Sequence, residues 1–168
     1  RLHLAIFAAY LLVAVIITWP LLTVFSTRLV GHPFGDTYEY ISLIWWFKHA
    51  LQTGGSLFYQ PLLAYPEGLS ARYLWSIPLQ SFPAWLFALV MPLPTAFNLS
   101  ILLTLALNGW SAFFLVSYLT DNRAAGWVSG VVFMAYPAFQ GHLAAGHIGL
   151  LQQWGVPLYV YTLLRLRQ

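Results

Sequence analysis

Hydrophobic residues occur along this chain in long blocks that are separated by shorter polar stretches. A transmembrane helix needs about 20 mostly apolar residues, within a range of about 17 to 25. Four blocks fit or nearly fit this length, and they cover residues 2–25, 96–119, 124–139 and 148–164. The pattern therefore predicts an all-α polytopic membrane protein. It forms a single domain over residues 1–168, with a long loop of residues 26–95 between the first two transmembrane helices.

A fifth apolar block, Ile77 to Pro94, is interrupted by prolines at positions 78, 83, 92 and 94. Whether it crosses the membrane decides the sidedness of everything after it. Lys and Arg are enriched in cytoplasmic segments, and this enrichment distinguishes the two possibilities. If the block does not cross, the arginines at positions 1, 123, 165 and 167 all lie on the cytoplasmic side. We therefore expect a juxtamembrane or re-entrant helix here, and we place residues 26–95 on the exterior face.

Composition agrees with a membrane location. Hydrophobic residues make up 60% of the chain and charged residues 7%, too few to cover a water-soluble globule of this size. The net charge of +3 comes from seven Lys and Arg that are scattered singly, so nucleic acid is excluded as a partner and membrane lipids are expected neighbours. The chain begins without Met, and we expect it to be part of a longer protein.

Within the loop, the stretch DTYEYISLIWWFKHAL, residues 36–51, has helical periodicity. Its apolar positions recur every three or four residues, at Tyr40, Leu43, Ile44, Phe47 and Leu51. An amphipathic helix of this kind lies along the membrane surface, with its tryptophans at headgroup depth. Gly54 and Gly55 are expected to end it.

Asp36 and Glu39 lie three residues apart at the start of this helix, so both carboxylates can occupy one helical face. One interpretation is structural: Asp36 caps the helix and Glu39 complements its dipole. The other is functional, because the chain has only four acidic residues and two of them follow the turn GHPFG, whose glycines allow a ligand to approach. Periodicity and spacing leave both interpretations open.

The ordered set GDTYEYISLIWWFKHAL, GGSLFYQPLLAYPEG and a Pro-rich helix resembles the first outer loop of the GT-C membrane glycosyltransferases. The likeness is to bacterial YfhO-like and mannosyltransferase-like members, and it corresponds to their N-terminal portion. It implies transfer of a sugar from a polyprenyl-phosphate donor on the exterior face of a bacterial plasma membrane, with Asp36 as the matching acid. The chain departs from the family in lacking a D-x-D sequence, and in offering QGHLAAGHIG where many members place an acid.

Glycosyl transfer needs a group that deprotonates or orients the acceptor hydroxyl, and cations or donors that hold the departing phosphate. Asp36 is the candidate for the first role. Glu39 either assists, shares a divalent cation (Mg²⁺ or Mn²⁺) with Asp36, or is a solvated side chain. Arg72 and Lys48 are exterior cations that can pair with a lipid phosphate, although Lys48 also fits a side chain that extends toward the headgroups.

His142 and His147 lie five residues apart in a Gly-rich stretch that we expect to be a turn. Two zinc ligands on one helix face are usually four apart, so a zinc site is disfavoured. Either imidazole can donate hydrogen bonds to phosphate or sugar oxygens. The alternative is that both are interfacial residues satisfied by backbone and water. The resemblance, which places a second part of the site here, favours function for His147.

Two other classes compete with the transferase. A non-catalytic integral membrane subunit or scaffold of a larger complex would have further membrane subunits as partners, and Asp36 would then only cap a helix. A transporter is disfavoured, because the middles of the four predicted membrane helices carry no Asp, Glu, Lys or Arg to mark an ion path.

Overall fold

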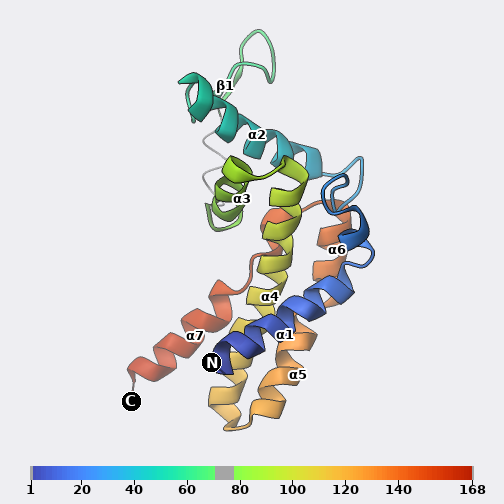
Figure 1. Cartoon of the computed structure of the whole chain (residues 1–168). Coiled ribbons are helices and arrows are strands. Elements are labelled where there is room, and N and C mark those ends of the chain that lie inside the picture. The colour runs from blue at the N-terminus through green and yellow to red at the C-terminus, as the bar shows by residue number, and fades with distance from the viewer. Residues whose placement is uncertain (1, 71–77, 168) are drawn as a thin grey trace.

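The computed structural model describes residues 2–70 and 78–167 and is mostly helical (Figure 1). Its elements are α1 (Leu2–Ile17), η1 (Leu21–Val24), α2 (Thr37–Thr53), β1 (Tyr59–Gln60), β2 (Leu69–Ser70), α3 (Pro78–Val90), α4 (Leu93–Thr120), α5 (Arg123–Met134), α6 (Pro137–Ala145), η3 (Ile148–Leu151) and α7 (Gly155–Leu166). The two strands have two residues each and pair antiparallel. The predicted all-α class is confirmed.

Helix α4 is the axis of the molecule. Its 28 residues run the length of the body in Figure 1, with α5 alongside and α1 crossing both. The fully buried side chains here come from α4 itself (Phe97, Ile101 and Leu105), from α1 (Tyr10) and from α5 (Met134). At about 42 Å, α4 exceeds the roughly 30 Å hydrocarbon core of a bilayer. Of the helices in the described part of the chain, α4 is the one both long and apolar enough to cross a membrane.

Small residues let α4 and α5 approach closely. Gly126 and Gly130 lie four residues apart on α5, and a Cβ added at either would overlap atoms of α4 or α1. This is the small-xxx-small spacing that brings helix backbones together in membrane proteins. The phenol of Tyr10 uses the gap and donates a hydrogen bond to the carbonyl oxygen of Trp127 (3.0 Å). Helices α1, α4 and α5 therefore form one packed unit.

The first apolar block is not one helix, so the prediction of a continuous helix over residues 2–25 is wrong. Helix α1 ends at Ile17, and Pro20, which has no N–H to continue the helix, precedes the 3₁₀ turn η1. Thr18 Oγ1 donates back to the Ala14 carbonyl (2.9 Å) at the break. The 16 residues of α1 span about 24 Å, less than the bilayer core.

The last two apolar blocks are also divided. Helix α5 ends at Met134 and α6 begins at Pro137, because the residue before a proline avoids helical backbone, and Tyr136 is extended (ψ 133°). QGHLAAGHIG, predicted as a turn, lies mostly in α6. The block of residues 148–164 becomes η3 and then α7. Helix α5 begins after Asn122, whose Oδ1 caps the helix by accepting from two backbone N–H groups.

Helix α2 is confirmed, and it ends where Gly54 adopts left-handed backbone (φ 71°). Its apolar face, however, packs on protein. Phe47 stacks on Trp85 of α3, with ring centroids 4.7 Å apart. The side chain of Trp46 is buried, and its Nε1 donates to the Ser56 carbonyl (3.0 Å). Helix α3, of 13 residues, covers part of this face, whereas Leu51 of the predicted stripe is exposed.

Two buried asparagines of α4 hold the segments that carry the candidate residues. Asn98 Nδ2 donates to the carbonyls of Phe25 (2.8 Å) and Arg28 (2.7 Å), and Asn98 Oδ1 accepts from Val30 N–H (3.2 Å). Both Asn98 and Asn108 have no exposed side-chain surface.

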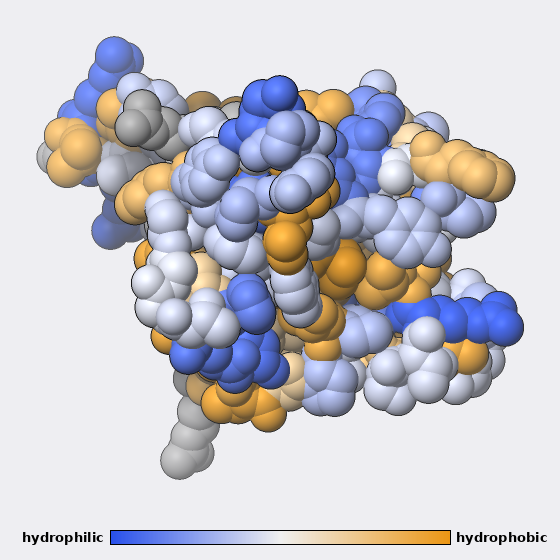
Figure 2. Space-filling model, turned by 90° about the horizontal axis from the view of Figure 1, so that it is seen from above, coloured by the Kyte–Doolittle hydropathy of each residue, from blue (hydrophilic) through white to orange (hydrophobic). Residues whose placement is uncertain are grey.

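Ten residues further along α4, Asn108 acts in the same way. Its Nδ2 donates to the Leu151 carbonyl (2.7 Å), and its Oδ1 accepts from Gln153 N–H (3.2 Å). One helix therefore fixes both the segment before α2 and the segment after α6. Figure 2 views the molecule from the α2 end, where hydrophilic residues spread across much of the face between hydrophobic ones.

Candidate functional site

Asp36 precedes α2 at the N-cap position but does not cap it. Its side chain makes no hydrogen bond to the first turn of the helix. Instead, Asp36 Oδ2 lies 3.8 Å from Nε2 of His147, and the two side chains are 54% and 43% exposed. The distance is an electrostatic contact, longer than a hydrogen bond. The capping interpretation of the Asp36 side chain is therefore wrong, and its contact is with the second predicted segment of the site.

Two glycines make this contact possible. A Cβ added at Gly35 would overlap the carbonyl of Ala145, and one added at Gly146 would overlap Thr37. Gly146 also has left-handed backbone (φ 80°), with which it ends α6. The glycines of the turn GHPFG were expected to admit a ligand. Gly35 instead admits the end of α6, which brings His147 to Asp36.

His142 continues the line of polar groups. Its Nδ1 lies 3.2 Å from Nδ1 of His147, so one ring nitrogen donates and the other accepts. When His147 carries its proton on Nε2, facing Asp36, its Nδ1 accepts from His142. His142 Nε2 is then left as a free acceptor. The three side chains form a row from carboxylate to imidazole to imidazole.

The same row shows what the protein lacks for a metal held by its own side chains. Asp36 faces Nε2 of His147, whereas His142 faces Nδ1, so the three groups do not converge on one point. Over residues 2–70 and 78–167, no three His, Cys, Asp or Glu side chains are placed to share a metal ion.

A cavity of about 490 Å³ opens beside Asp36 and His147. Its walls come from the turn before α2 and from the last turns of α6, and its other lining residues are His32, Phe34, Gly35, Gly141, Ala144 and Ala145. The volume lies within the range of about 300 to 1,000 Å³ that is typical of small-molecule sites. The acid and the imidazole therefore border a space that a small molecule can enter.

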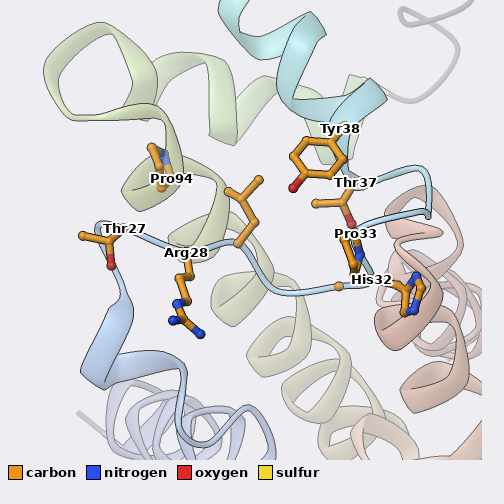
Figure 3. Close-up of a pocket in the computed structure, with 9 residues that line it drawn as sticks. Thr27, Arg28, His32, Pro33, Thr37, Tyr38 and Pro94 are labelled. Atoms are coloured by element: carbon orange, nitrogen blue, oxygen red, sulfur yellow. The ribbon is translucent and has the colours of Figure 1, made fainter.

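A second cavity of about 490 Å³ adjoins the first, because His32 lines both. Figure 3 shows Thr27 and Arg28 on one side of it, and Thr37 and Tyr38 at the start of α2 on the other. The hydroxyl of Thr37 is buried and has no hydrogen-bond partner in the described part of the chain. Arg28 is exposed and brings a guanidinium to this cavity.

Tyr40, in the first turns of α2, contacts the second segment. Its hydroxyl accepts a hydrogen bond from the Gly149 N–H (3.1 Å), just after His147. Burial raises the pKa of the Tyr40 phenol above its ordinary value, the Gly149 hydrogen bond opposes this, and the carboxylates of Asp36 and Glu39 raise the pKa further. Tyr40 is thus a neutral hydroxyl beneath the acids.

The other predicted residues have different outcomes. Glu39 is exposed in the first turn of α2 and lines neither cavity. Lys48 lies about 18 Å along the helix axis from Asp36 and also lines neither. Arg72 lies outside the described residues. The structure therefore brings together Asp36, His147 and His142, and leaves Glu39 at the margin.

Comparison with known families decides one point. The profile of DUF6311, described as a domain of unknown function, matches residues 6–168. The chain belongs to the DUF6311 family. No curated protein matches it, and no solved structure does. The site of this DUF6311 chain is therefore interpreted from its own geometry.

Four residues of the DUF6311 site are missed by sequence reasoning alone: Arg28, His32, Phe34 and Tyr40. All four lie within eight residues of Asp36. His32 is easily taken for a turn residue, and Tyr40 for part of an apolar stripe. The usable signal is the density of cationic and aromatic side chains around a turn that ends in an acid.

Proposed function

We propose that this DUF6311 chain belongs to a membrane glycosyltransferase of the GT-C type. The enzyme moves a sugar from a polyprenyl-phosphate donor to an acceptor on the exterior face of a bacterial plasma membrane. The proposal includes four membrane crossings. The observation that carries it is the approach of Asp36 to His147 (3.8 Å) beside an open cavity. Two segments far apart in the sequence thus supply one half-exposed acid and two imidazoles.

The proposed reaction uses Asp36 as general base. The acceptor hydroxyl gives its proton to the Asp36 carboxylate while its oxygen bonds to the anomeric carbon of the donor sugar. The bond between that carbon and the phosphate oxygen breaks, and polyprenyl phosphate leaves with the electron pair. His147, which lines the cavity, supplies its Nε2–H for sugar or phosphate oxygens, and its hydrogen bond with His142 (3.2 Å) orients the ring.

The second cavity suits the donor phosphate. Arg28 offers a planar guanidinium, which binds phosphate oxygens through two parallel hydrogen bonds. Thr37 lines the same cavity, and its buried hydroxyl has no partner in the described part of the chain. Because His32 borders both cavities, a phosphate near Arg28 and an acceptor near Asp36 would be neighbours. In this arrangement Arg28 takes the role that the sequence suggested for Arg72 or Lys48.

A divalent cation, Mg²⁺ or Mn²⁺, is also part of the proposal. Mg²⁺ is commonly held by one or two carboxylates together with substrate phosphates. Asp36 is the described carboxylate on the cavity, with Glu39 three residues on, so a donor phosphate would have to complete the shell. Such a cation would neutralise charge on the departing phosphate. EDTA should then abolish donor turnover and Mg²⁺ restore it; undiminished turnover in EDTA would remove the cation.

The test is turnover of labelled polyprenyl-phosphate sugars by the intact protein in lipid nanodiscs. Membrane lipid extract supplies acceptors, and release of polyprenyl phosphate is measured. Asp36→Asn should lower turnover by about 10² or more, the scale of general acid–base groups. Glu67→Gln, the same change at an exposed acid away from the site, should turn over normally. Wild-type turnover by a folded Asp36→Asn protein would overturn the mechanism. No turnover of any donor by the wild type would favour the non-catalytic subunit.

A further inference from the structure

The turn between η1 and α2 presents an aromatic ring to solvent. Phe34 is 92% exposed, the highest value among the large hydrophobic side chains in the described part of the chain. It lines the cavity beside Asp36. An apolar ring kept in the open forgoes the free energy of burial, so its position at the mouth of a polar cavity calls for a physical reason.

The ring is held on a short, well-braced turn. The Gly35 N–H donates to the His32 carbonyl (3.0 Å), and the Phe34 N–H donates to His32 Nδ1 (3.2 Å). Gly35 packs against the backbone of Ala145. Because the backbone of this turn is anchored, Phe34 is held at the edge of the cavity, and its ring lies near that of His32, with centroids 5.6 Å apart.

The wall contributed by α6 is made of small residues. Gly141, Ala144 and Ala145 line the cavity, so little side chain projects from that helix into the space. The polar groups that line it are Asp36, His147 and His32. The cavity therefore has the Phe34 ring on one wall and small residues on the α6 wall, with a carboxylate and imidazoles at its edge.

We infer that Phe34 is the platform on which a pyranose ring stacks, with its hydroxyls directed at Asp36 and His147. One face of a pyranose carries C–H groups, which are attracted to the negative face of an aromatic ring. Its hydroxyls can donate to a carboxylate and accept from an imidazole. A lipid tail could form no hydrogen bond with Asp36, and the negative charge of Asp36 would repel an anion.

This inference rests on the proposed function for the identity of that sugar. Asp36 takes the proton of the acceptor, so the ring beside Asp36 is the acceptor's ring. The acceptor is then itself a glycoside rather than a protein hydroxyl or a simple lipid alcohol. The donor sugar enters from the Arg28 side, attached to its phosphate.

Binding is tested with methyl hexopyranosides as probes, by saturation-transfer NMR on the protein in nanodiscs. Wild type should show transfer to the C–H protons of one ring face. Phe34→Leu keeps apolar bulk but removes the aromatic face, and should lower affinity about tenfold. Phe34→Trp should retain binding. Phe82→Leu is the matched control, since Phe82 on α3 is exposed (55%) and lines neither cavity.

The outcomes separate the two proposals. Equal binding by Phe34→Leu and wild type, or no binding of any hexopyranoside by wild type, overturns the platform. If glycosides bind through Phe34 but no polyprenyl-phosphate sugar turns over, the transferase fails and the platform stands. If turnover occurs, Phe34→Leu should raise KM for a glycoside acceptor about tenfold with kcat nearly unchanged. An unchanged KM would leave the transferase and remove the platform.

Discussion

Polar side chains have opposite roles in the interior of α4 and in the site near its end. Asn98 and Asn108 have no exposed surface, and their side-chain amides form hydrogen bonds with the backbone of neighbouring segments. Asp36 and His147 are about half exposed and stand 3.8 Å apart. Buried polar groups here fix the positions of segments, whereas the site groups keep hydrogen-bonding capacity for a ligand.

The largest expected effect is on the interior. Asn98→Leu keeps the size of the side chain but leaves two carbonyls and one N–H of residues 25–30 without partners. An unsatisfied buried group costs about 1 to 3 kcal/mol, and these three groups are only partly buried, so the variant should lose about 3 kcal/mol of stability in all. Thermal unfolding in nanodiscs measures it, with Gln52→Leu at an exposed position as control. Equal melting of the two variants would contradict the anchoring role.

A smaller loss of stability with a large loss of activity is expected at the contact between the two segments. Gly146→Ala places a Cβ against Thr37 at a residue with φ 80°. Stability should fall by about 1 to 3 kcal/mol, because left-handed backbone is strained for alanine. Donor turnover should fall at least about tenfold as Asp36 and His147 separate. Gly155→Ala, which meets open space, is the control, and parallel turnover of both variants would show that the contact is dispensable.

The smallest effect is expected at Tyr40, a residue that shares features of both regions. Its raised pKa means that the folded protein binds the phenolic proton more tightly than the unfolded chain does. The resulting stability is complete below the ordinary pKa of 10.0 and is lost as pH rises above it. Tyr40→Phe should therefore flatten the decline in melting temperature as pH rises above 10.0. An identical alkaline decline in both proteins would show that Tyr40 does not contribute.

Local patterns predicted the local structure. The periodicity over residues 36–51 predicted α2, and Gly54 its end, because both depend on neighbours in the sequence. Pro20 and Pro137 mark the divisions of two apolar blocks, but the length and hydropathy that define a membrane span do not register them. Proline chemistry then decided where each helix stopped.

The site was only partly predictable. Asp36, His142 and His147 were named as candidates, but nothing in the spacing indicated that they would meet. Their meeting depends on Gly35 and Gly146, whose close approach joins segments far apart in the chain. The anchoring role of Asn98 was hidden for the same reason, since its partners lie about 70 residues away. Contacts of that range are set by tertiary packing, which a single sequence does not display.

If Asp36 and His147 act as one unit, a double-mutant cycle on donor turnover should reveal their coupling. Asp36→Asn, His147→Gln and the double variant are compared with wild type in nanodiscs, after equal melting temperatures establish that all are folded. Groups that act together are strongly non-additive, so the double variant should be no more than about threefold slower than the slower single variant. Losses that multiply would show that Asp36 and His147 act independently, and would contradict the account.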